Sequence, residues 1–114
     1  MNQLTSRAEY EEFIYGLQPQ FPAIAYSTLL VVRRGVGTLQ VRGEIIFSGG
    51  VRLIVAERLM LDGRILRIVS YGYEVWRGAE KLYWYDSQPH PDTRSNLPFL
   101  IAEIEQDLLK VPLP

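Results

Sequence analysis

The sequence contains no cysteine, a single histidine (His90) and only two lysines among its 114 residues. The absence of cysteine excludes disulfide bonds and thiolate zinc sites. One histidine leaves few nitrogen ligands, and we expect no metal and no cofactor. Long apolar runs are also missing, because stretches such as 27–32 fall far short of the ~20 residues that cross a bilayer. The polar, acidic N-terminus is unlike a signal peptide. We therefore expect a cytoplasmic protein without a membrane segment.

The net charge is small, but the charged residues are unevenly placed along the chain. The formal net charge is −1, and ten arginines stand against the two lysines. Residues 33–81 carry a net charge of +4, whereas 1–32 and 82–114 carry −2 and −3. Guanidinium groups suit planar pairing with phosphate or carboxylate. The cationic middle therefore indicates either cross-strand ion pairs or a surface for an anionic partner.

Helical patterns occur near both ends. Ser6-Arg7-Ala8-Glu9 has the form of a capping box, and apolar residues follow at helical spacing up to Leu17. Near the C-terminus, Asn96 is a candidate cap, and Leu97, Leu100, Ile101, Ile104 and Leu108 repeat with the same period. Val111-Pro-Leu-Pro is expected to end this second helix.

Strand patterns fill the middle. The stretch 23–32 is almost wholly apolar, which predicts a strand covered on both faces. Residues 38–48 alternate as a half-buried strand does. Gly49-Gly50, Asp62-Gly63 and Gly78-Ala79 are hairpin turns by composition. If Gly49-Gly50 is the whole first loop, Arg42 lies opposite Glu57. The expected fold is α+β: one domain over 1–114, with a curled antiparallel β-meander of about five strands packed with an N-terminal and a C-terminal amphipathic helix.

An aromatic ribbon spans residues 64–91 and holds four tyrosines, both tryptophans and the only histidine. With a two-residue Gly78-Ala79 loop, Tyr73 is expected opposite Trp84 and Tyr71 opposite Asp86, so that these four form one patch. Such rings either pack under a helix or stack with bases. For the second case, the candidate nucleic-acid-binding residues are Arg58, Arg67, Arg77, Trp84 and Tyr85.

The segment 85–91 leaves the last strand and enters a proline-bounded loop, where functional side chains are often displayed. His90 would serve as a general acid or base, and Asp86 would orient it. Arg67 or Arg77 would stabilise the negative charge that develops on the reacting group, and Tyr71, Tyr73 or Tyr85 would provide a second proton relay. Together these groups suffice for metal-free phosphodiester cleavage, and the candidate catalytic residues are His90, Asp86, Tyr71 and Tyr73.

The motifs of residues 43–91 occur in an order that resembles the TumE-like toxin components of prokaryotic toxin–antitoxin pairs. The shared features are an acidic residue late in a strand, an Asp-Gly turn, a Tyr-x-Tyr strand and a (Tyr/Trp)-Asp-x-x-Pro-His segment. The matching positions are Glu57, Asp62, Gly63, Tyr71, Tyr73, Tyr85, Asp86, Pro89 and His90. The resemblance implies a toxin with a small antitoxin protein encoded nearby, and it favours RNA as the target.

One departure from that family matters for activity. Its Pro-His pair is commonly followed by a second histidine and a later Pro-His-His-Lys-His-like cluster, whereas Pro91 follows His90 here and the later region reads 96–100, Asn-Leu-Pro-Phe-Leu. If those histidines carry an activity, this chain lacks it. A toxin that binds RNA without cutting it, a metal-free ribonuclease, and a non-catalytic protein-binding or homodimerisation module therefore all stay open.

Overall fold

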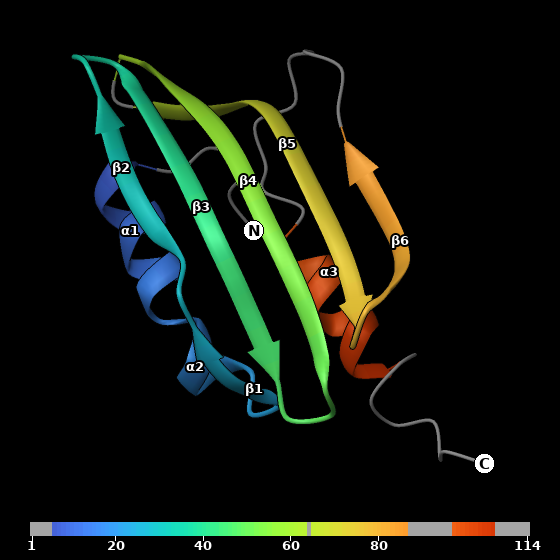
Figure 1. Cartoon of the computed structure of the whole chain (residues 1–114). Helices are drawn as coiled ribbons and strands as arrows, with labels where there is room; N and C mark the ends of the chain where they lie inside the picture. The colour runs from blue at the N-terminus through green and yellow to red at the C-terminus, as the bar shows by residue number, and fades with distance from the viewer. Residues whose placement is uncertain (1–5, 64, 87–96, 107–114) are drawn as a thin grey trace.

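The computed structural model describes residues 6–63, 65–86 and 97–106 (Figure 1). The described elements are α1 (Arg7–Tyr15), α2 (Leu17–Gln20), β1 (Ile24–Ser27), β2 (Leu30–Arg34), β3 (Thr38–Phe47), β4 (Val51–Asp62), β5 (Ile65–Arg77), β6 (Glu80–Asp86) and α3 (Leu97–Ile104). The strands form one antiparallel sheet that is not closed, and the helices lie behind it, α1 and α2 towards β2 and α3 towards β5 and β6 (Figure 1). The predicted α+β class is confirmed.

Strands β3, β4, β5 and β6 form the predicted meander, in which each strand pairs with its neighbour in sequence. The other edge of β3 is shared, because both β1 and β2 pair with it. Six strands are thus described instead of about five, since the stretch 23–32 makes two short strands. The expectation that both faces of this stretch are covered was wrong: Leu30 is exposed, and only Ile24 and Leu29 are buried.

The break between β1 and β2 depends on Gly43. Its φ is +145°, and a Cβ at this position would lie 2.6 Å from the backbone oxygen of Thr28. Thr28 also donates its backbone N–H to the Glu44 carbonyl at 2.8 Å, and its Oγ1 accepts from the Glu44 N–H at 2.9 Å. Only glycine leaves room for this close approach, so the chain can turn aside here while it remains attached to β3.

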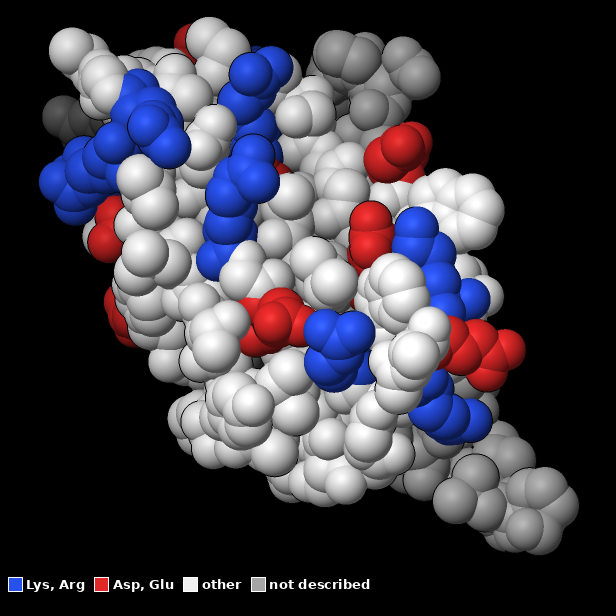
Figure 2. Space-filling view, viewed as in Figure 1, with Lys and Arg blue, Asp and Glu red and all other residues white. Residues whose placement is uncertain are grey.

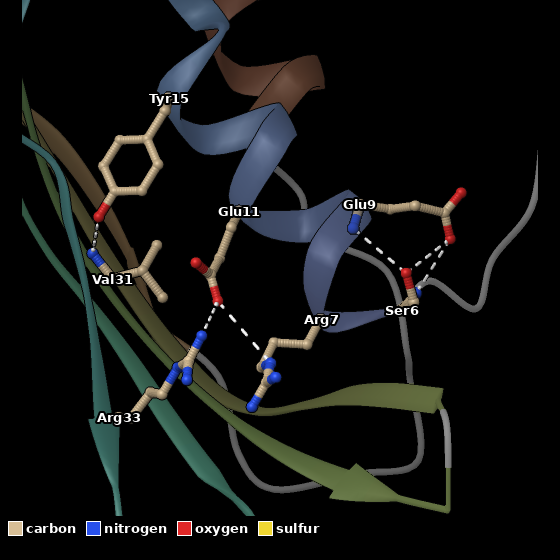
Figure 3. A network of polar contacts seen from close by, with 7 residues as sticks. All are labelled: Ser6, Arg7, Glu9, Glu11, Tyr15, Val31 and Arg33. Carbon is tan, nitrogen blue, oxygen red and sulfur yellow. Dashed lines mark hydrogen bonds and ion pairs between the residues drawn. The ribbon is translucent and has the colours of Figure 1, made fainter.

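Helix α1 begins as predicted. The Ser6 Oγ accepts from the Glu9 N–H at 3.2 Å, and the Glu9 carboxylate accepts from the Ser6 N–H at 3.1 Å. Glu11 fixes the outer side of the helix to β2, with its Oε2 3.4 Å from Arg33 and 3.9 Å from Arg7 (Figure 3). The Val31 N–H donates to the Tyr15 hydroxyl at 3.0 Å (Figure 3). Arg33 is therefore already paired with a carboxylate.

The core lies between the sheet and the helices. From the sheet it takes alternate residues of β3 to β5, and from the helices it takes Tyr10, Ile14, Leu17, Leu97, Leu100, Ile101 and Ile104. The alternation predicted for 38–48 is confirmed, because Leu39, Val41, Ile45 and Phe47 are all buried. The prediction that two amphipathic helices cover one face of the sheet is confirmed too. The predicted cap at Asn96, the continuation to Leu108 and the stop at Val111 lie outside the described residues.

The register of the first hairpin, between β3 and β4, differs from the predicted one. The loop takes Ser48 with both glycines, since β3 ends at Phe47 and β4 begins at Val51. Glu57 therefore lies opposite Val41, and Arg42 lies opposite Ala56. The predicted Arg42–Glu57 pair was wrong, because one extra loop residue moves a side chain to the other face of the sheet.

The predicted turn of the last hairpin is confirmed, but the strand pairs beyond it differ from the prediction. The loop is Gly78-Ala79, as Arg77 pairs with Glu80. A bulge then leaves an extra residue in β6, so that Tyr73 pairs with Tyr85, Glu74 with Trp84, and Gly72 with Asp86. The predicted Tyr73–Trp84 and Tyr71–Asp86 pairs were wrong. A bulge sets two residues of one strand against one of its partner, which shifts all later pairs.

Candidate functional site

The face of the sheet turned away from the helices is the open face, and Figure 2 views it directly. Basic side chains gather over the upper part of β2 to β4, whereas basic and acidic groups alternate lower down (Figure 2). The lower groups neutralise one another: Arg52 lies 2.7 Å from Glu44, and Lys81 lies 3.8 Å from Glu74. Any anion site on this face is therefore expected in the upper part.

A hollow of about 300 Å³ lies in this upper part. It is called the arginine hollow below, and its lining is Gln40, Arg42, Ala56, Glu57, Arg58, Ser70, Tyr71 and Gly72. Its floor is low because Ala56 and Gly72, which have small or no side chains, face each other across β4 and β5. Within the described part of the chain, neither Arg42 nor Arg58 forms an ion pair. Two unneutralised guanidinium groups beside a low floor can hold an anion.

A second cavity, of about 280 Å³, opens between α3 and strands β5 and β6. It is called the aromatic pocket below, and its lining is Tyr71, Tyr73, Tyr85, Phe99, Leu100 and Glu103. The rings of Tyr71 and Tyr73 are stacked with their centroids 5.0 Å apart. The Tyr85 hydroxyl donates to Glu103 at 3.3 Å. Burial and then the nearby Glu103 carboxylate raise the pKa of Tyr85, which keeps this hydroxyl a donor.

Glu57 borders the arginine hollow, is only 3% exposed, and contacts Tyr73 of the aromatic pocket. Its carboxylate accepts hydrogen bonds from the hydroxyls of Tyr10 and Tyr73. Burial, and then the charge of Glu57, raise the pKa of Tyr10 well above its usual value. Satisfying a buried carboxylate in this way is what permits an acidic side chain in the core. Sequence reasoning missed these contacts, because the partners stand 47 and 16 positions away.

The predicted site residues are divided between the two faces. Tyr71, Tyr73 and Tyr85 line the aromatic pocket, whereas Arg58 lines the arginine hollow, which Tyr71 also borders. Trp84 and Asp86 pair with Glu74 and Gly72, which places both on the open face. The expected patch of Tyr71, Tyr73, Trp84 and Asp86 is therefore not assembled.

The remaining predicted residues lie elsewhere. Arg67 is paired with Asp62 at 2.9 Å, and Arg77 lies opposite Val51 at the far end of β5. His90 lies outside the described residues. Arg42 was not predicted as a binding residue, because the assumed register paired it with Glu57; its alternation with Val41 was the signal that placed it on the open face.

Two kinds of feature are absent from the described residues. No group of three or more histidine, cysteine, aspartate or glutamate side chains in the described ranges is placed to hold a metal ion. Among the same residues, no helix has the length and apolar character that crossing a membrane requires.

Comparison with known proteins gives one family. Residues 16–103 match the family described as Toxin TumE, a range that includes all six strands and most of α3. No curated protein and no solved structure gives a significant match. Both the arginine hollow and the aromatic pocket lie inside the matched range.

Proposed function

Because the chain belongs to the TumE toxin family, we propose that it is the toxin of a toxin–antitoxin pair and that it binds RNA through the arginine hollow. The observation that carries the proposal is the pair of Arg42 and Arg58 in that hollow, with no carboxylate paired to either within the described residues. Basic groups that neutralise phosphates supply most of the sequence-independent affinity for nucleic acids.

The proposed roles follow from the geometry. Arg42 and Arg58 contact backbone phosphates, and the small residues Ala56 and Gly72 let the backbone approach the sheet. Trp84 is 63% exposed on the same face. It pairs with Glu74, which lies two residues along β5 from Gly72. An exposed ring of this kind stacks with an unpaired base, which contributes about 1–3 kcal/mol.

Cleavage is a separate part of the proposal and rests on Asp86 and His90. Asp86 ends β6 opposite Gly72, at the border of the arginine hollow. His90 follows it by four residues in the sequence. In this scheme His90 removes or supplies a proton at the phosphodiester, and Asp86 orients it. Loss of RNA cleavage with retained RNA binding in the His90→Ala variant would support this part, and cleavage by that variant would remove it.

Binding is tested by fluorescence anisotropy with an end-labelled RNA of mixed sequence at 50–200 mM salt. The test variant is Arg42→Gln/Arg58→Gln. The matched control is Arg52→Gln/Arg67→Gln, which removes the same charge from two arginines that already pair with Glu44 and Asp62. We expect the test variant to bind at least about tenfold more weakly, and to lower the slope of log K against log salt by about 1.4, from two single-strand phosphate contacts.

The binding proposal has a clear contrary outcome. If the test and control variants lose RNA affinity equally, the effect is one of net charge and the arginine hollow is not the site. If neither loses affinity, RNA does not bind to this face.

The proposed partner is a small antitoxin, encoded nearby, that carries an acidic segment and covers the arginine hollow in the cytoplasm. Residues 33–81 carry a net charge of +4, which complements such a segment. The wild-type toxin should form a complex with the product of the adjacent small gene, and the Arg42→Gln/Arg58→Gln variant should bind that product more weakly. Equal binding by both proteins would place the antitoxin elsewhere.

A second role, as a dimerisation or protein-binding module, is favoured by one observation. Trp84 is a large exposed ring on β6, the last strand of the sheet. Sedimentation of the wild type and of Trp84→Ala distinguishes the roles: a dimer that dissociates in the variant indicates self-association, whereas a monomer in both cases excludes it.

A further inference from the structure

The aromatic pocket lies on the helix side of the sheet and is not used by the proposed RNA contact of the open face. Its walls come from Tyr71, Tyr73 and Tyr85 on the strands and from Phe99, Leu100 and Glu103 on α3. Its volume of about 280 Å³ is at the lower limit for small-molecule sites. We propose that this pocket binds one guanine base between its aromatic walls, with the base edge on Glu103.

The walls suit a planar ring. Tyr71 and Tyr73 form a stacked pair with an interplanar angle of 21°, and because Tyr73 is only 1% exposed, the partly buried Tyr71 is the ring of this pair that a base can reach. Phe99 stands on α3 and is 56% exposed although it lines the pocket. A large apolar ring that remains exposed gains most when a flat ligand covers it. Every base has such a flat surface, so stacking alone does not select among the four.

Glu103 supplies the selection. A carboxylate has two oxygens that only accept hydrogen bonds. Among the pairing edges of the four bases, guanine alone presents two adjacent donors, its N1–H and its 2-amino group. Adenine, cytosine and uracil each place an acceptor beside the donor, and that acceptor repels the second carboxylate oxygen. Recognition of unpaired bases by aromatic stacking and by hydrogen bonds to this edge is the general mode for RNA-binding proteins.

The surroundings of Glu103 keep it available. The Tyr85 hydroxyl donates to its Oε1 at 3.3 Å, which orients the carboxylate along the pocket wall. Within the described ranges no lysine or arginine forms an ion pair with Glu103. One hydrogen bond occupies one of about four acceptor positions of a carboxylate, which leaves enough for a bidentate contact.

The test compares the four nucleoside 5′-monophosphates on the full chain by isothermal titration calorimetry. Because all four carry the same phosphate, their difference reports the base. We expect GMP to bind at least about tenfold more tightly than AMP, CMP or UMP. Inosine monophosphate, which lacks the 2-amino group, should bind more weakly than GMP. Equal dissociation constants for the four, or no detectable binding of GMP at millimolar concentration, would overturn the proposal.

Two variants assign the binding to this pocket. Glu103→Gln replaces one acceptor with a donor and should remove the preference for GMP, whereas Glu12→Gln makes the same change of charge on an exposed part of α1 and should leave it intact. Phe99→Ala removes an exposed wall and should weaken binding of all four nucleotides without loss of the fold. If the GMP preference persists in Glu103→Gln, guanine binds elsewhere and the proposal fails.

The source of the guanine is separated by a second comparison. A guanine in RNA predicts that a short single-stranded oligonucleotide binds more tightly than GMP, and that Arg42→Gln/Arg58→Gln removes only this increment. A free nucleotide predicts that GMP binds as tightly as the oligonucleotide and is insensitive to the arginine variant. Either result supports the guanine site, and the site stands even if the arginine hollow proves not to bind RNA.

Discussion

The hydroxyl of Tyr10 on α1 donates a hydrogen bond to the buried carboxylate of Glu57 on β4, across 47 positions of sequence. The hydroxyl of Tyr73 donates to the other carboxylate oxygen. One acidic side chain thus joins the N-terminal helix, a central strand and the strand that forms a wall of the aromatic pocket. Any change at this carboxylate is expected to disturb the packing of α1 and the position of Tyr73 together.

The Tyr10→Phe variant should be less stable than the wild type by about 1.5–3 kcal/mol, because a buried carboxylate loses a hydrogen bond and gains nothing in return. Urea unfolding followed by circular dichroism measures the difference. The matched control is Tyr15→Phe on the same helix: Tyr15 is exposed and its hydroxyl accepts from the Val31 N–H, so we expect a loss below about 1 kcal/mol. Equal losses would show that the Tyr10–Glu57 contact contributes no special stability.

Stability should fall in alkaline solution. The pKa of Tyr10 is raised well above its usual value of about 10 by burial and by Glu57. Above that usual value the unfolded chain releases the Tyr10 proton while the folded chain retains it, so the unfolded state binds fewer protons and the free energy of unfolding decreases as the pH rises. Below it, Tyr10 contributes no pH dependence. Urea titrations between about pH 8 and 11.5 should show a steeper alkaline decline for the wild type than for Tyr10→Phe; parallel curves would contradict this.

The Gly43→Ala variant should be destabilised by at least about 1–3 kcal/mol. Its φ of +145° is unfavourable for other residues, and the new Cβ would meet the backbone of Thr28. Gly72→Ala is the control in the same sheet, since a Cβ there has no atom within 4 Å. Thermal unfolding of both variants measures this contrast. Because Gly72 forms part of the floor of the arginine hollow, we also expect its alanine variant to fold normally and to bind RNA more weakly.

Growth arrest on induced expression should separate binding from cleavage. If the toxin acts by binding alone, the His90→Ala variant should still arrest growth, and Arg42→Gln/Arg58→Gln should not. If it acts by cleavage, both variants should permit growth. Immunoblots of the induced cells control for expression. Arrest by the arginine variant at wild-type protein level would exclude the arginine hollow from the mechanism.

Local sequence rules predicted much of this fold because they depend on neighbouring residues. The capping box of Ser6 and Glu9, the apolar alternation of β3 and the positive φ of Gly63 all involve groups within a few positions of one another. The order of motifs in 43–91 likewise indicated the family, since a linear pattern survives without knowledge of the fold.

Registers could not be predicted in the same way. Ser48 joins the loop after β3, and a bulge adds one residue to β6. Neither choice is visible in the local composition, because each depends on which side chains the two strands and the helices bury together. The first displaced Glu57 from the predicted contact with Arg42, and the second separated Asp86 from Tyr71.

The sequence by itself therefore determined the helices, the meander, the family and the set of chemically useful side chains. Only the tertiary structure decided which of them act together: Arg42 with Arg58 on the open face, and Tyr71 and Tyr85 with Glu103 in the aromatic pocket. The physical reason is the two-residue period of a strand, since a shift of one residue in pairing moves every later side chain to the other face of the sheet.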